Sequence, residues 1–88
     1  GVPMSYGGEV LSPGSEGEDV RTVQKQLNRI SQNFPAIPKI PVDGVYGPAT
    51  QGAVLEFQKL FHLPQTGRVY FASWYEISDV FVAVSGLA

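Results

Sequence analysis

Apolar residues recur at helical spacing in three stretches of the chain, and glycine and proline interrupt the chain between them. In the first stretch the apolar positions are three or four residues apart, so they share one face of a helix over about residues 18–32. These positions are Val20, Val23, Leu27 and Ile30. The second stretch covers about residues 48–62 and the third about residues 72–84. The pattern predicts an all-α fold, a compact three-helix bundle with long connecting loops.

The size and charge of the chain narrow its class. Its 88 residues are 43% hydrophobic and 16% charged, which suits one small globular domain with a modest core. The formal net charge of -2 lacks the basic footprint of a nucleic-acid binder. No apolar run reaches the roughly 18 residues that a membrane span needs. We therefore expect a monomeric module with no nucleic-acid partner and no membrane insertion.

The first residues have the composition of a linker. Residues 1–14 contain four glycines and two prolines, so we interpret them as a linker or boundary segment and residues 15–88 as the domain. No basic-then-apolar signal segment opens the sequence. If the parent protein is exported, its signal is expected outside this sequence.

The stretch VDGVYGPAT, residues 42–50, is predicted to be a tight entry into the second helix. Gly44 and Gly47 permit conformations that a side chain would hinder, and Asp43 can accept hydrogen bonds from the following amides. Pro48 suits a first helical turn. A similar stretch leads into the third helix. Placing residues 43–54 over 66–77 aligns Gly44 with Gly67, Ala49 with Ala72, Thr50 with Ser73 and Val54 with Ile77.

The connector before this loop has proline at every third position: Pro35, Pro38 and Pro41. Such spacing favours an extended, polyproline-like run that cannot continue a helix. A PxxP ligand for a partner domain is one interpretation. A stiff connector that packs Phe34, Ile37 or Ile40 on the core is the favoured one.

Catalytic groups are sparse. The chain has no cysteine, and His62 is its only histidine. Glu76 and Asp79 lie three residues apart on the outward side of the third helix, whereas the carboxylates of glycosidases flank a sugar across a cleft. We therefore expect no enzyme activity, no metal and no cofactor in this domain.

Several motifs together resemble a known family. They are LSPGSEGEDVRTVQKQLNRI, VDGVYGPATQGAVLEFQKLFHLPQTGRV and SWYEI, in that order between residues 11 and 77. The sequence is similar to the peptidoglycan-binding domain of the three-helix type, which is appended to bacterial cell-wall hydrolases and spore cortex enzymes. One departure is Tyr70-Phe71, where the family often repeats a Gly-Pro before the third helix.

This resemblance implies a non-catalytic bacterial module that binds peptidoglycan or another cell-wall polymer and targets an attached enzyme or surface protein to the wall. It also implies an extracellular or wall-associated location, with catalysis in another part of the parent protein. A shallow groove for such a ligand needs aromatic platforms and polar partners. The aromatic candidates are Tyr46, Tyr70 and Tyr75, and the polar candidates are Asp43, Gln51 and Gln58.

A second function class stays open on the sequence. The same fold could dock on the catalytic domain of its own parent enzyme, as a spacer or a propeptide-like element. Exposed apolar groups at Leu55, Tyr75 and Val82 would support docking if they formed one contiguous patch.

Overall fold

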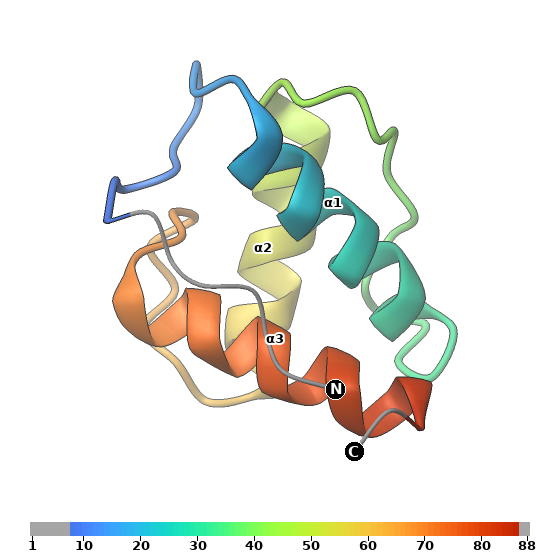
Figure 1. The fold of residues 1–88 in the computed structure, drawn as a ribbon. Helices are drawn as coiled ribbons and strands as arrows, with labels where there is room; N and C mark the ends of the chain where they lie inside the picture. Colours follow the sequence, from blue (N-terminus) through green and yellow to red (C-terminus); the bar gives the residue numbers. More distant parts are fainter. Residues whose placement is uncertain (1–7, 87–88) are drawn as a thin grey trace.

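Three α-helices make up the framework of the computed structural model, which describes residues 8–86 (Figure 1). They are α1 (Glu18–Ser31), α2 (Pro48–Leu60) and α3 (Phe71–Ser85). The predicted all-α class and the order of three helices are therefore confirmed. Helix α2 ends two residues earlier than expected, because His62 has a φ of 59° and so lies in the left-handed region, outside a helix. Within the described residues, none of the helices is both long and apolar enough to cross a membrane.

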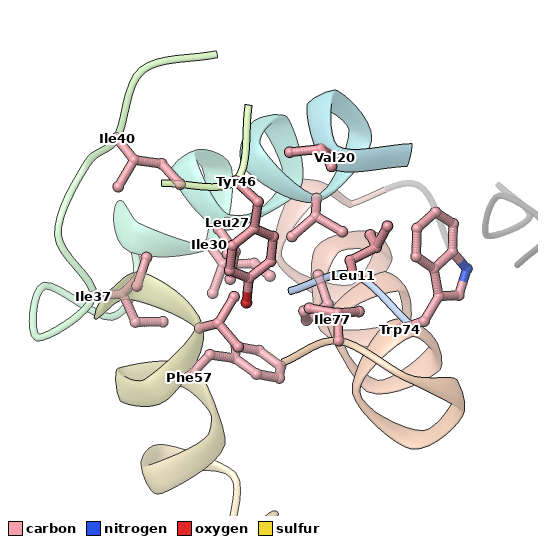
Figure 2. Close-up of a cluster of buried hydrophobic side chains, with 14 residues drawn as sticks. Leu11, Val20, Leu27, Ile30, Ile37, Ile40, Tyr46, Phe57, Trp74 and Ile77 are labelled. Atoms are coloured by element: carbon pink, nitrogen blue, oxygen red, sulfur yellow. The ribbon is translucent and has the colours of Figure 1, made fainter. Parts of the chain in front are cut away.

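The three helices enclose one core. Figure 1 shows α3 lying across the ends of the other two, and α1 packs more extensively on α3 than on α2. The buried apolar residues come from all three helices and from the connecting segments. They are Leu11, Val20, Val23, Leu27, Ile30, Ile37, Ile40, Tyr46, Ala53, Val54, Phe57, Val69, Trp74 and Ile77 (Figure 2). Burial of these side chains is the main stabilising term of the fold.

The apolar faces predicted for the helices match the core with one exception. All four positions predicted for α1 are fully buried, as are Trp74 and Ile77 on α3. Leu60 follows the apolar spacing of α2, but 38% of its surface is exposed. It is the last residue of the helix.

The proline-rich connector packs as predicted for a stiff element. Ile37 and Ile40 are buried at 2% and 4% exposure, whereas Pro35, Pro38 and Pro41 are exposed. Helix α1 holds the connector through hydrogen bonds between the side chain of Asn28 and the backbone of Ile40. The side-chain amide donates to the carbonyl of Ile40 at 2.7 Å and accepts from its N–H at 2.8 Å. The connector is therefore fixed to the bundle at its midpoint.

Part of the segment expected to be a linker, residues 1–14, packs on the bundle. Leu11 is buried at 5% exposure and pairs with Val69 through two backbone hydrogen bonds of 2.8 Å. Gly14 and Gly17 also donate to the backbone of the loop before α2. The glycine- and proline-rich composition favoured a linker, but one leucine and a few backbone pairs bind this segment to the bundle. Residues 1–7 of the expected linker lie outside the described residues.

Candidate functional site

Two loops of similar construction lead into α2 and α3, and we call residues 43–50 the first turn and residues 66–73 the second turn. At the first turn the buried side chain of Gln24 on α1 forms hydrogen bonds with the backbone N–H and carbonyl groups of the turn. Its Oε1 atom accepts from the N–H groups of Asp43 at 3.0 Å and Gly44 at 2.9 Å. Its Nε2 atom lies 3.0 Å from the carbonyl of Val45 and from the Thr50 hydroxyl. One glutamine thus fixes the whole turn.

Gln58 on α2 does the same for the second turn. Its Oε1 atom accepts from the N–H of Gly67 at 3.0 Å. Its Nε2 atom lies 2.9 Å from the carbonyl of Arg68, 3.1 Å from the hydroxyl of Ser73 and 3.2 Å from that of Thr66. Ser73 takes the place that Thr50 has at the first turn. The internal similarity of the sequence therefore reflects a repeated structural unit.

The two turns also share their backbone conformation. Gly44 and Gly67 have φ angles of 74° and 71°, a region that glycine adopts without the steric cost of a Cβ atom. The residues that cap α2 and α3, Gly47 and Tyr70, are both extended, with ψ angles of -168° and -165°. The entry geometry is therefore the same although the cap residues differ.

Three of the predicted site residues meet at Gly67. The Tyr46 hydroxyl donates to the Gly67 carbonyl at 2.6 Å, Gln58 accepts from its N–H, and a Cβ added to Gly67 would lie 3.1 Å from Nε2 of Gln51. Tyr46 was expected at the surface, but its ring is 1% exposed and lies among the core side chains (Figure 2). Gln58 is 1% exposed. Both side chains support the second turn from inside and present no surface to a ligand.

The burial of Tyr46 also changes its acidity. Removal of the ring from water raises the pKa of the Tyr46 hydroxyl well above its ordinary value, because the phenolate would lose its hydration. The hydroxyl therefore stays protonated and donates to Gly67. This residue aligns with Val69 in the second turn, which is also buried, so the position belongs to the core in both units.

Asp43 lies apart from this group, at the surface of the first turn. Its carboxylate accepts from the N–H of Val45 and from Nε2 of Gln24, both at 3.0 Å. These two hydrogen bonds lower the pKa of Asp43 below its ordinary value. The carboxylate is thus exposed, but the turn already uses it.

Tyr70 is a predicted site residue that faces solvent, at 57% exposure, and Phe71 next to it is 60% exposed. The Phe71 ring packs on that of Tyr75 with centroids 5.0 Å apart. Tyr70 also lines a shallow cavity of about 170 Å³, which we call the second-turn pocket. Its lining residues are Pro64, Thr66, Arg68, Tyr70, Ala72 and Ser73.

The pocket lies on the outer side of the second turn. Burial alternates along this turn: Gly67 and Val69 are buried, while Thr66, Arg68 and Tyr70 are exposed. Sequence reasoning did not select Arg68 as a site residue. The alternation of polar and apolar residues from Thr66 to Tyr70 was the signal that could have placed it beside Tyr70.

The residues proposed as a docking patch do not form an exposed one. Leu55, Tyr75 and Val82 are each half-buried. A second cavity of about 320 Å³ lies between α1 and α3, with Lys25, Gln26 and Phe81 among its lining residues. Within residues 8–86, histidine, aspartate and glutamate form no group of three or more that could hold a metal ion.

Comparison with known proteins agrees with the fold and the motifs. The crystal structure of the SleB N-terminal domain superposes on this chain with a TM-score of 0.75 at 27% sequence identity, and the match covers 88% of this chain and 99% of that one. Among curated proteins no sequence matches. The profile of the family described as "Putative peptidoglycan binding domain" matches residues 16–72. That range includes the first turn, all but the last residue of the second turn, and more than half of the sequence, so the chain belongs to this peptidoglycan-binding domain family.

Proposed function

We propose that this domain binds bacterial peptidoglycan without catalysing a reaction, and that it holds the protein of which it is part at the cell wall. The contact surface in this proposal is the second-turn pocket together with the rings of Tyr70 and Phe71. Membership of the family supports the ligand class. The observation that supports this surface is the pair of exposed aromatic rings at the edge of a cavity.

The first turn provides an internal comparison for these two rings. Gly47 and Pro48 stand where the second turn has Tyr70 and Phe71, and they start α2 with the same backbone geometry. In both units the N–H four residues after the cap donates to the carbonyl of the cap residue, at 3.0 Å for Gly47 and 2.8 Å for Tyr70. The fold therefore does not require aromatic rings at this position. Two large apolar groups in water that the fold does not need favour a role in binding.

The chemistry of the surface suits a wall fragment. An exposed aromatic ring offers a flat apolar face to a sugar or a peptide, and its hydroxyl can bond to a polar group. Arg68 adds a cation to the same face of the turn. By contrast, the outward residues of the first turn are Asp43, Val45 and Gly47, which supply an occupied carboxylate and no ring.

The experiment is a pull-down on insoluble peptidoglycan, prepared with and without its teichoic acids. The test variant carries Tyr70→Gly and Phe71→Pro, which copies the Gly47-Pro48 entry of the first turn into the second. Tyr70 is already extended, which is the conformation required before proline. The control variant carries Val42→Ala and Val45→Ala, which removes apolar surface that is 41% and 44% exposed at the first turn.

Retention of the native domain and of the control, with loss of the test variant at an unchanged circular dichroism spectrum, is the expected result. Retention of all three would move the contact surface away from the second turn. Failure of the native domain to be retained on either preparation would overturn peptidoglycan binding itself. Retention only where teichoic acids are present would assign the ligand to the secondary polymer.

A further inference from the structure

The second-turn pocket joins a small apolar cavity to an unneutralised cation. Pro64, Ala72 and the ring of Tyr70 contribute apolar walls, and Arg68 lines the same cavity. Within residues 8–86 the only ion pair joins Arg21 to Glu18 at 3.1 Å. In that part of the chain Arg68 forms hydrogen bonds only through its backbone N–H and carbonyl. Its guanidinium is thus available to a ligand.

The hydroxyl groups of Thr66 and Ser73 in the pocket are occupied, in contrast to the guanidinium of Arg68. Thr66 Oγ1 lies within 3.2 Å of Gln58 Nε2 and of both backbone polar atoms of Arg68. Ser73 accepts from Gln58 at 3.1 Å and is 8% exposed. A site that reads sugar hydroxyls needs several free polar side chains that converge on the ring. Arg68 instead offers a planar, five-donor cation, which matches a carboxylate in a bidentate pair.

The volume of the pocket limits the size of its ligand. At about 170 Å³ it is smaller than the roughly 300–1,000 Å³ of ordinary small-molecule pockets. It can therefore enclose a small terminal group and not a disaccharide unit. Peptidoglycan peptides end in such a group, because their terminal alanine joins a methyl side chain to a free carboxylate.

We infer that the second-turn pocket binds the terminal carboxylate of a wall peptide, with the carboxylate paired to Arg68 and the methyl group in the apolar cavity. This inference rests on the proposed function and names the part of the polymer that the same surface takes. The ring of Tyr70 lies along the preceding peptide unit in this arrangement. Recognition then depends on a free chain end, so the domain prefers wall whose peptides are not cross-linked at that carboxylate.

The test is an NMR titration of the full chain with N-acetyl-D-alanyl-D-alanine, and with the same dipeptide as its C-terminal carboxamide. The acid is expected to shift the backbone amide signals of residues 66–73. The carboxamide is expected to bind at least about tenfold more weakly, which corresponds to the loss of about 1.4 kcal/mol from a charge-assisted contact. Arg68→Gln should lose the preference for the acid, and Arg68→Lys should keep part of it, because lysine retains the charge but not the fork. Lys59→Gln, which removes an exposed cation from α2, is the matched control and should bind the acid as the native chain does.

Each outcome separates this inference from wall binding. Equal binding of acid and carboxamide, or an Arg68→Gln variant with native affinity for the acid, would overturn the inference, and the pull-down on peptidoglycan would still decide the proposed function. A tetramer of N-acetylglucosamine that shifts the 66–73 signals when the dipeptide does not would overturn it in favour of a glycan site. Absence of any shift with the dipeptide acid would also overturn it, whether or not the native domain is retained on peptidoglycan.

Discussion

Gln58 holds Gly67 in its left-handed conformation. The side-chain oxygen of Gln58 accepts from the N–H of Gly67 at 3.0 Å, and Gly67 has a φ of 71°. Gln24 holds Gly44 in the same way, at 2.9 Å and a φ of 74°. Each of the first two helices therefore supplies one buried amide that fixes the entry into the helix that follows it. The long loops of this small bundle are ordered by these amides, since the described residues have only isolated β-bridges and no sheet.

Replacement of either glutamine by leucine should destabilise the domain by about 2–4 kcal/mol, because it leaves buried backbone groups without partners. Gln24→Leu and Gln58→Leu should lose similar amounts, since their hydrogen bonds correspond. Urea unfolding followed by circular dichroism measures the change. Gln65→Leu, at an exposed loop position, is the control and should stay within about 0.5 kcal/mol of the native chain. A urea midpoint for Gln58→Leu equal to that of the native chain would show that water replaces the hydrogen bonds of the Gln58 side chain without loss of stability.

Replacement of three glycines by alanine, one at a time, should give variants that differ in stability in a predictable order. Gly44→Ala should be the worst, because its Cβ would lie 3.3 Å from the backbone oxygen of Gly17, which cannot move aside. Gly67→Ala has the same left-handed strain of roughly 1–2 kcal/mol, but its Cβ meets the flexible side chain of Gln51. Gly52→Ala, inside α2 with nothing within 4 Å, should stabilise the domain by roughly 0.5–1 kcal/mol. Thermal unfolding midpoints check the order, and a Gly67→Ala midpoint below that of Gly44→Ala would contradict it.

The helices could be predicted from sequence because apolar spacing depends only on local order. The similarity of the two turns could also be predicted, since glycine and a small hydroxyl residue recur at the same distance in both. The burial of Gln24 could also have been predicted from its position. It lies four residues after Val20 and three before Leu27, so it falls on the buried face of α1, where a polar side chain needs a partner inside the protein.

The site was harder to predict, because the exposure of a side chain depends on whether it points to the core or to the solvent side of its segment. Tyr46 and Tyr70 both follow a glycine turn, and the ring of either could offer a flat face to a sugar. They are one position out of step in the repeat, since Tyr46 aligns with the buried Val69 and Tyr70 with Gly47. A shift of one residue reverses the side of an extended chain. Tyr70 is therefore exposed at the candidate site, whereas Tyr46 and Gln58 are buried and hold Gly67 from inside.

The stability of the domain should fall in alkali because of Tyr46. Burial raises the pKa of this hydroxyl in the folded state, whereas an unfolded tyrosine has a pKa of about 10. The contribution of the Tyr46 hydroxyl to the stability of the fold is therefore fully present below about pH 10. It is lost as the pH rises above that value, because only the unfolded chain releases the proton. Tyr46→Phe should be less stable at neutral pH by about 1–2 kcal/mol, since the Gly67 carbonyl loses its donor. Urea midpoints across this range should show a shallower alkaline decline for Tyr46→Phe, and parallel declines would assign the effect to other groups.

Asp43 should contribute the opposite dependence in acid. Hydrogen bonds from the Val45 N–H and the Gln24 side chain lower its pKa in the folded state. The stabilisation is therefore present above the unfolded value of about 3.9 and is lost as the pH falls below it. Asp43→Asn should be less stable than the native chain at neutral pH, and the difference should vanish in acid. Asp79→Asn removes the same charge from an exposed position on α3 and controls for net charge.

Leu11 should mark the true start of the domain. Its side chain is 5% exposed, and its backbone exchanges two hydrogen bonds of 2.8 Å with Val69, directly before Tyr70. Leu11→Ala should therefore destabilise the domain by about 2–5 kcal/mol, as expected for a buried leucine, and should broaden the NMR signals of the second turn. Val10→Ala, one residue earlier and 45% exposed, should leave both unchanged. Because Leu11 anchors the segment that bears Tyr70, a chain shortened to begin at residue 15 should also bind peptidoglycan more weakly than the full chain. Equal retention of the two would show that the second turn keeps its shape without this anchor.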